Sequence, residues 1–353
     1  MLTLDLCPPT RSNPRHDHQL IFPLSDRRLL LVWSEYYATR PSEVAAAESA
    51  PPLDDNVPCR ISARISTDRG RSWSESFTIQ DNVGAMNVKH PNLLRLPSHE
   101  ILFFFTVWNH SRERLVLLKR SADEGEHWSA PVRVSTRPGF NNVNNDHVLR
   151  LGSGRIVLPA FVSPVIWEAG EHFVAFCYLS DDDGRSWRAG AASVDLPRRG
   201  AEEPSVVALT DGRLLMMLRT SLGQLYRAVS ADGGETWSVP EPTGLASPAA
   251  PPLLKRMPDG RRLLLIWNEG YDASHSHQGE RSVLAAAVSE DEGLGWRRIR
   301  DVDRVPGGAA SYASVTFDGG EAFVSYYYQE RGIGGRSGIR LRIVPPDWLG
   351  ASS

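Results

Sequence analysis

Cysteine is scarce in this sequence: Cys7, Cys59 and Cys177 are the only three among 353 residues. Their number is odd and their spacing matches no pattern of metal ligands, which argues against a disulfide scaffold and against a zinc site. His275 and His277 stand one residue apart, but no third ligand is within reach by sequence. We therefore expect reduced thiols, no metal and no cofactor.

Long apolar runs are also missing. No stretch approaches the roughly 18 apolar residues that a membrane-spanning helix needs. The first 20 residues lack the apolar core of an export signal, because residues such as Pro8, Arg11 and Asp17 interrupt them. Together with reduced thiols, this favours a cytoplasmic protein without a membrane partner.

The chain has no large excess of charge of one sign. Its 39 basic and 42 acidic residues give a formal net charge of −3, and no basic stripe is visible. Binding to nucleic acid therefore has no electrostatic support. Composition and length are compatible with one soluble domain over residues 1–353.

Repetition is what this sequence has in abundance. The eight-residue phrase Ser-x-Asp-x-Gly-x-x-Trp occurs five times, beginning at Ser66, Ser121, Ser180, Ser230 and Ser289. A period of roughly 50 to 60 residues is typical of folds assembled from repeated units. In such a phrase the Asp folds its carboxylate back on the backbone, the Gly supplies a positive φ, and the Trp plugs the adjoining sheet. The five Asp residues are therefore expected to be structural.

A second pattern, two apolar runs around a turn, occurs six times. Its copies span residues 18–33, 90–108, 146–162, 203–220, 250–269 and 312–328. Six copies predict an all-β fold, a six-bladed β-propeller with four strands in each blade. The sixth unit lacks the eight-residue phrase, so we expect the N-terminal segment to close the last blade, because a closed ring leaves no exposed sheet edge.

The antiparallel order of the strands places the starts of the innermost strands on one rim and the eight-residue phrases on the other. The innermost strands begin at His18, His90, Asp146 with His147, Glu203, Ala250 and Tyr312. Five of these six positions are polar or ionisable, whereas a purely structural ring would favour small or apolar residues. The pattern indicates a polar funnel that binds a ligand.

The eight-residue phrase is similar to the Asp box, or BNR repeat, of the sialidase (neuraminidase) superfamily, which the chain resembles over nearly its whole length. The segment from Glu203 to Arg219 resembles the one that carries the catalytic glutamate and the second arginine of the carboxylate-binding triad. The segment around Tyr312 resembles the one with the nucleophilic tyrosine. Arg281 falls where the superfamily has its third arginine.

The resemblance implies an exo-acting glycoside hydrolase that retains the anomeric configuration and releases a terminal acidic sugar, sialic acid first among them. A neutral phenol is a suitable nucleophile there, because a carboxylate would approach the like charge of the sugar. Tyr312 would be the nucleophile, Glu203 its base, and Arg219 and Arg281 would grip the sugar carboxylate. The partner is then a glycan or glycoconjugate.

The sequence departs from the superfamily at two points. The short sequence phrase that carries the first arginine of the carboxylate-binding triad is absent. In its place stand His16, Asp17 and His18, with Arg15 just before them. In the superfamily, the acid that protonates the leaving group is an Asp on the loop between strands two and three of the first blade. On that loop, residues 34–58, Asp54 and Asp55 are the candidates.

Further residues are expected around the substrate because they lie at inner-strand starts or at second-strand ends. These substrate-binding candidates are Arg15, His18, His90, Asp146, His147 and Glu269.

The residues leave other functions open. A polysaccharide lyase could use Tyr and His as base and acid for β-elimination on the same propeller. The altered first arginine site leaves room for a glycosidase acting on another acidic or a neutral sugar. A non-catalytic glycan-binding propeller is the third possibility, favoured by the loss of the first arginine.

Overall fold

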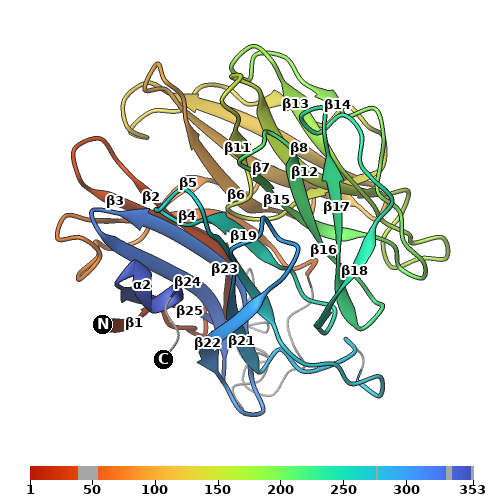
Figure 1. Cartoon of the computed structure of the whole chain (residues 1–353). Helices are drawn as coiled ribbons and strands as arrows, with labels where there is room; N and C mark the ends of the chain where they lie inside the picture. The colour runs from red at the N-terminus through yellow and green to blue at the C-terminus, as the bar shows by residue number, and fades with distance from the viewer. Residues whose placement is uncertain (39–54, 276, 331–335, 351–353) are drawn as a thin grey trace.

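A computed structural model describes residues 1–38, 55–275, 277–330 and 336–350, and its strands form a ring of mainly antiparallel sheets (Figure 1). The first blade contains β2 (Arg15–Pro23), β3 (Leu29–Tyr36), β4 (Cys59–Ser66) and β5 (Phe77–Gln80). The second contains β6 (Asn87–Arg95), β7 (Ile101–His110), β8 (Glu113–Ser121) and β9 (Val132–Arg133). The third contains β10 (Phe140–Val143), β11 (Leu149–Arg150), β12 (Ile156–Ser163), β13 (Val174–Ser180) and β14 (Arg188–Ala189).

The second half of the ring repeats this order. The fourth blade contains β15 (Glu202–Ala208), β16 (Leu214–Arg219), β17 (Gln224–Ser230) and β18 (Glu241–Ala246). The fifth contains β19 (Leu253–Arg256), β20 (Leu263–Asn268), β21 (Val283–Ser289) and β22 (Arg297–Arg304). The last contains β23 (Ala309–Asp318), β24 (Glu321–Gln329) and β25 (Gly338–Val344), followed by the short helix α2 (Pro346–Gly350).

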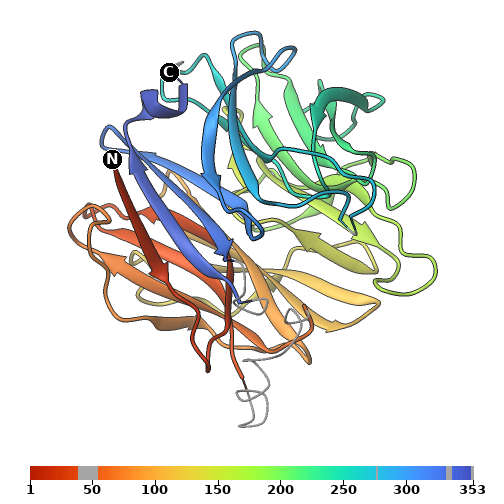
Figure 2. The same ribbon diagram turned by 90° about the horizontal axis from the view of Figure 1, so that it is seen from below.

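The N-terminal strand β1 (Leu2–Cys7) pairs antiparallel with β25, so the last sheet has the order β1-β25-β24-β23. Figure 2 shows this dark red strand beside the blue C-terminal strands. The all-β propeller prediction is confirmed, and the single domain over residues 1–353 stays a prediction. Among the described residues, no helix has the length and apolar character needed to cross a membrane.

The second and third blades depart from the regular pattern, because they share one nine-stranded sheet. The join is a parallel pair in which Phe140 of β10 lies opposite Arg114 of β8. The inner strand of the third blade is also divided into β10 and β11, which both pair with β12. This join forms one wall of the pocket described below.

Apolar side chains close the seams between neighbouring blades. At the seam between the last blade and the first, Leu31 and Trp33 of β3 pack with Phe323 of β24 and Leu341 of β25. Corresponding clusters lie at the five other seams. Full burial of each such side chain stabilises the fold by about 1.5–3 kcal/mol. The short apolar runs of the sequence are therefore blade strands that are buried on both faces.

One irregularity recurs at the start of the inner strands. His18, His90, Glu203 and Tyr312 have φ angles of 51°, 58°, 41° and 55°, and the strand pairing shifts at each of them. Asp146 has the same conformation, with φ 58°. A positive φ is costly for residues other than Gly, and a bulge re-aims the side chain that it carries. These equivalent inner-strand positions of the repeats thus share one backbone conformation.

The eight-residue phrases form closed turns that pack against the preceding blade. In the phrase that begins at Ser180, Ser180 Oγ donates to Asp182 Oδ1 and accepts from the Gly184 N–H, both at 2.8 Å. Trp187 Nε1 donates to the Gly184 carbonyl at 3.1 Å. Gly184 has φ 79°, and an added Cβ would lie 3.0 Å from Leu102 of the second blade. The Asp of this phrase therefore serves its own turn, as predicted from the sequence.

Ser180→Ala is expected to lower the free energy of unfolding by about 1–3 kcal/mol, because it leaves the buried N–H of Gly184 without its partner and removes one hydrogen bond to Asp182. Urea unfolding of the variant and the parent measures this difference. Ser98→Ala, at an exposed position in the turn between β6 and β7, is the matched control and should change little. Equal stability of the two variants would contradict a structural role for the phrase.

Candidate active site

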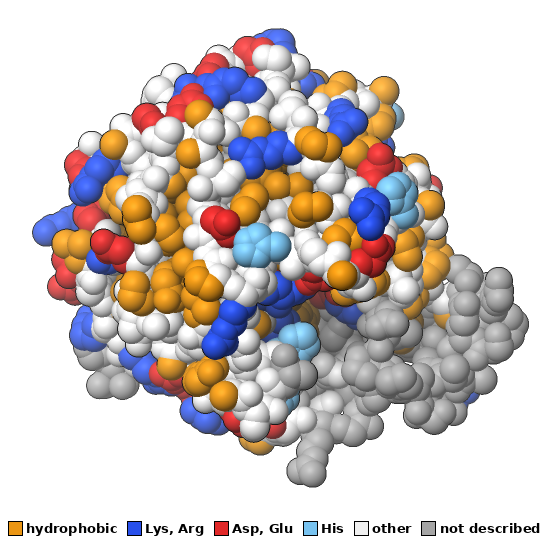
Figure 3. Space-filling model, turned by 90° about the vertical axis from the view of Figure 1, so that its right-hand side faces the viewer, with side chains coloured by type: hydrophobic (Ala, Val, Ile, Leu, Met, Phe, Trp, Pro, Cys, Tyr) orange, Lys and Arg blue, Asp and Glu red, His pale blue; other side chains and the backbone are white. Residues whose placement is uncertain are grey.

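One face of the molecule is hollowed near its centre, where charged side chains lie recessed and histidines stand beside them (Figure 3). The large pocket of the propeller has a volume of about 750 Å³ and is lined from the inner-strand starts, the second-strand ends and the third-strand starts. None of its lining residues belongs to an eight-residue phrase. This agrees with the expectation that these phrases occupy the other rim.

Tyr312 of the last blade and Glu203 of the fourth blade meet inside this pocket. Tyr312 Oη donates a hydrogen bond to Glu203 Oε1 at 2.7 Å. Arg219 Nη1 donates to the other carboxylate oxygen, Oε2, also at 2.7 Å. The two residues are far apart in sequence, and their shared inner-strand bulge aims both at the axis. The contact is within the reach that a nucleophile and its base require.

Electrostatics set the resting protonation states of this pair. Burial raises the pKa of Glu203, but the charges of Arg219 and Arg281 and the hydrogen bond from Tyr312 outweigh it and leave the pKa below its usual value. Burial and the neighbouring Glu203 carboxylate hold the pKa of the Tyr312 phenol well above its usual value. At neutral pH Glu203 is therefore an ionised acceptor and Tyr312 a protonated phenol, the states that a base and its latent nucleophile need.

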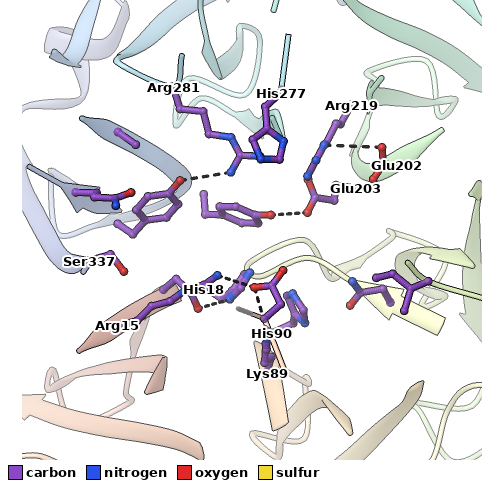
Figure 4. A pocket seen from close by; sticks show the side chains of 18 of the residues that line it. Arg15, His18, Lys89, His90, Glu202, Glu203, Arg219, His277, Arg281 and Ser337 are labelled. Carbon is purple, nitrogen blue, oxygen red and sulfur yellow. Dashed lines mark hydrogen bonds and ion pairs between the residues drawn. The ribbon is translucent and has the colours of Figure 1, made fainter. Parts of the chain in front are cut away.

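Arg219 and Arg281 point into the same side of the pocket (Figure 4). Arg281 lies 5.6 Å from the centroid of the Tyr312 ring, donates from Nη1 to the Tyr327 hydroxyl at 3.4 Å and donates from Nη2 to the Ala249 carbonyl at 2.7 Å. Its Nε has no hydrogen-bond partner among the described residues. The two guanidinium groups therefore place positive charge on one wall of the pocket, beside the Tyr312 ring.

The first blade brings a histidine, His18, next to Tyr312. The His18 ring lies 4.6 Å from the Tyr312 ring and 4.1 Å from the His90 ring, measured between centroids. His18 Nδ1 is 2.5 Å from Asp17 Oδ1, and Arg15 Nε donates to Asp17 Oδ2 at 2.8 Å. Arg15 lines the pocket and is bound to Asp17 and Asp55, and its role as a substrate contact stays a prediction.

Of the two predicted acid candidates, only Asp55 is among the described residues. Asp54 lies outside the described residues. Asp55 lines the pocket, where its Oδ1 accepts from Arg15 Nη2 at 2.8 Å and from Lys89 Nζ at 3.3 Å. Desolvation raises the pKa of Asp55, but these two cations outweigh it and hold the pKa well below the usual range. A general acid needs a pKa near the working pH, so these contacts favour an electrostatic role for Asp55.

Three predicted substrate contacts are not brought to this pocket. Asp146 accepts from Lys255 Nζ at 2.8 Å and from Ser314 Oγ at 2.7 Å, while His147 Nε2 lies 3.2 Å from the Pro252 carbonyl. Both Asp146 and His147 line a separate cavity of about 300 Å³. Glu269 accepts from Arg298 Nε at 2.9 Å on the outer side of the fifth blade. Internal hydrogen bonds and ion pairs therefore occupy these side chains, which corrects their predicted placement.

Several residues of the pocket wall were not predicted from the sequence, including Lys89, Trp108, Arg114 and Trp167. A usable signal existed for Arg114, which is at the start of a third strand just as Arg281 precedes the third strand of the fifth blade. No group of three or more His, Cys, Asp or Glu side chains suited to holding a metal occurs among the residues that the structure describes.

Comparison with known proteins assigns the family. Residues 44–324 match the BNR repeat-like domain. The chain belongs to the BNR repeat-like family. It is 28% identical over 306 residues to a sialidase of Micromonospora viridifaciens, a match that covers 75% of this chain and 44% of that protein. This BNR repeat-like chain therefore spans less than half the length of that relative.

Solved structures share the fold. A protein of unknown function from Dyadobacter fermentans has a TM-score of 0.76 at 20% identity, covering 97% of this chain and 99% of that one. A Trypanosoma rangeli sialidase in complex with 2,3-difluorosialic acid, a covalent intermediate, has a TM-score of 0.74 at 14% identity, covering 99% and 60%. This BNR repeat-like chain therefore shares the propeller fold of these structures.

The Asp17 contacts predict a pH dependence of stability. Burial raises the pKa of Asp17, but the charges of His18 and Arg15 outweigh it and lower the pKa from 3.8 to about 2. Because the folded state holds the proton more weakly than the unfolded state, this group stabilises the fold above about pH 4 and the contribution is lost as the pH falls to about 2.

In Asp17→Asn, the free energy of unfolding should therefore fall less steeply between about pH 4 and pH 2 than in the parent, by about 2 kcal/mol in total. Urea unfolding at several pH values measures both curves. Parallel curves over this interval would mean that Asp17 does not titrate as its contacts require.

Proposed function

We propose that this protein is an exo-acting, retaining glycoside hydrolase that releases a terminal acidic sugar, with sialic acid as the first candidate. The observation that carries the proposal is the 2.7 Å hydrogen bond from Tyr312 Oη to Glu203. It lies beside two arginines, Arg219 and Arg281, that line the same pocket. A paired nucleophile and base next to anion-binding groups is suited to a sugar whose anomeric carbon carries a carboxylate.

In the first step, the Tyr312 oxygen bonds to the anomeric carbon, its proton passes to Glu203, and the bond to the leaving oxygen breaks as that oxygen takes a proton from the acid. In the second step, water attacks the anomeric carbon and returns a proton to that acid. Tyr312 then leaves the sugar and regains its proton from Glu203. The two inversions at the anomeric carbon give net retention.

Arg219 and Arg281 fix the sugar by its carboxylate. A planar guanidinium presents parallel N–H groups that match the two oxygens of a carboxylate. Because Arg219 already binds Glu203, it links the base to the substrate-binding wall. Trp167, which lines the pocket and is 52% exposed, offers a flat face to the rest of the glycan.

His18 is the acid that we propose in place of Asp55. Its Nδ1 faces Asp17 at 2.5 Å, which leaves Nε2 on the opposite edge of a ring that lines the pocket. The Asp17 carboxylate orients the imidazole as carboxylates commonly do for catalytic histidines. Asp55, bound to Arg15 and Lys89, has no comparable freedom to carry a proton.

The pair of Tyr312 and His18 favours a second candidate function, β-elimination by a polysaccharide lyase. His18 lies 4.6 Å from Tyr312 between ring centroids, so a base and an acid stand side by side. The base would remove the proton next to a uronate carboxylate, a carbon–carbon double bond would form, and the leaving oxygen would take a proton from the acid. This reaction needs no covalent bond between Tyr312 and sugar.

A substrate screen separates the candidates. Aryl sialosides, uronides and rhamnosides are incubated with the protein and the products are followed by proton NMR and ultraviolet absorbance. The proposed function predicts release of free sialic acid, first as the anomer of the substrate. An ultraviolet-absorbing unsaturated uronate would support the lyase instead. Binding without turnover of any substrate would indicate a glycan-binding propeller.

A further inference from the structure

Arg114 occupies a position in the pocket that the proposed chemistry does not use. It stands in β8, where the parallel pair with Phe140 joins the second and third blades. Its guanidinium lies against two aromatic rings, 4.5 Å from the Trp108 centroid and 4.3 Å from the Phe140 centroid, and these rings meet each other at 84°. The side chain lines the pocket although the residue is only 3% exposed. The irregular join of the two blades therefore holds a cation in the corner of two aromatic rings.

This cation has no counter-ion among the residues that the structure describes. The Arg114 side chain makes no hydrogen bond and no ion pair with any of them, and its Nε is buried without a partner. Burial lowers the pKa of its guanidinium to about 10, with the charge of Asp55 acting in the opposite direction, so the group stays charged at neutral pH. A buried charge without a partner is costly, and its stacking on two rings compensates only in part.

The side chains around Arg114 also carry more positive than negative charge. Lys89, which is 2% exposed and 5.6 Å from the Trp108 centroid, uses Asp55 as its partner. Arg15 uses both Asp55 and Asp17. Within the described part of the chain, three cations on this wall therefore face two carboxylates, Asp17 and Asp55, which already contact Arg15 and Lys89. An anion brought by a ligand would restore the balance.

We propose that Arg114 is a second anion-binding site of the pocket, which takes an acidic group of the glycan other than the one held by Arg219 and Arg281. Figure 4 shows Lys89 and Arg15, its cationic neighbours, across the pocket from Arg219 and Arg281. The two sites therefore lie on different walls and suit a saccharide with two acidic groups. The second group is a carboxylate or a sulfate, and the inference rests on the proposed function for the first group only.

Inorganic sulfate is the probe for the site itself. Sulfate should raise the melting temperature of the parent above that in sodium chloride of equal ionic strength, because it binds the folded state. In Arg114→Met this difference should shrink by at least half, and the melting temperature without sulfate should not fall, since the variant removes an unpaired buried charge. An unchanged sulfate response in Arg114→Met would overturn the proposal.

The matched control is Arg137→Met. Arg137 also stacks on an aromatic ring, 3.9 Å from the Phe176 centroid, but it lies outside the pocket. Its replacement should leave the sulfate response at the parent value. Arg114→Lys should recover little of the response, because an ammonium lacks the flat fork that the two rings hold. Full recovery by Lys, or an equal loss in Arg137→Met, would count against the site.

Substrate pairs identify the second acidic group. The first pair is a disialyl glycoside and its monosialyl analogue, and the second is a sialyl-galactoside with and without a sulfate on galactose. For at least one pair, the parent should show kcat/KM at least about tenfold higher with the second acidic group, and this ratio should approach one in Arg114→Met. A carboxylate site predicts the higher kcat/KM ratio for the disialyl pair, and a sulfate site predicts it for the sulfated pair. Ratios near one in the parent for both pairs would overturn the proposal.

Failure of this site and failure of the proposed function remain distinguishable. Hydrolysis of sialosides with a sulfate response that Arg114→Met does not change overturns the second site alone. A sulfate response that depends on Arg114 in a protein that hydrolyses no acidic sugar supports the site and overturns the proposed function alone.

Discussion

Tyr312→Phe and Glu203→Gln are each expected to lower kcat by about 10²- to 10⁴-fold, and the double variant is expected to be little worse than either single one. Phe cannot attack the anomeric carbon, and Gln cannot take the proton that Tyr312 must lose. Since the two side chains share one hydrogen bond of 2.7 Å, they act as a unit and their losses do not add.

The measurement is a set of kcat values for the parent, both single variants and the double variant on an aryl sialoside. Ser98→Ala, at an exposed turn, is the control for handling and should keep the parent value. Full activity of Tyr312→Phe would exclude the phenol as nucleophile. Two losses that multiply in the double variant would mean that Tyr312 and Glu203 act independently.

Arg281→Ala is expected to lower kcat/KM on an acidic sugar by about 10²- to 10³-fold, through the loss of a charge-assisted contact with the substrate carboxylate worth several kcal/mol. Arg281→Lys should restore little, because a point charge lacks the planar fork that pairs with two oxygens. The expectation follows from the position of Arg281, 5.6 Å from the Tyr312 ring.

Arg298→Ala is the matched control for this prediction. Arg298 stands in the same blade, but its ion pair with Glu269 lies outside the pocket. It should keep the parent kcat/KM. Parent-like values for Arg281→Ala and Arg281→Lys would mean that no carboxylate is held at this wall.

The repeats made most of the fold predictable. Five turn phrases and six strand pairs give the number of blades and the rim on which each turn lies. They also place Glu203 and Tyr312 at equivalent positions of their repeats. In the structure both lie on the inner-strand bulge, with φ 41° and 55°. Their contact could be anticipated because equivalent positions of a closed ring converge on its axis.

The third blade was less predictable because its departures arise from contacts between blades. Asp146 shares the bulge conformation, but Lys255 of the fifth blade pairs with its carboxylate and keeps it out of the large pocket. The parallel pair of Phe140 and Arg114 depends on the irregular path of β10. Neither contact has a signature within a single repeat, so periodicity alone could not predict the wall that Arg114 forms.

The most direct test of the proposed function is a search for a covalent glycosyl adduct on Tyr312. The protein is incubated with 2,3-difluorosialic acid, whose fluorines destabilise the cationic transition state and slow release of the sugar, and is then examined by intact-mass and peptide mass spectrometry. We expect one added sugar, located on the peptide that contains Tyr312, and none in Tyr312→Phe. An adduct on another residue, or no adduct in a preparation that turns over sialosides, would contradict the assignment of Tyr312 as the nucleophile.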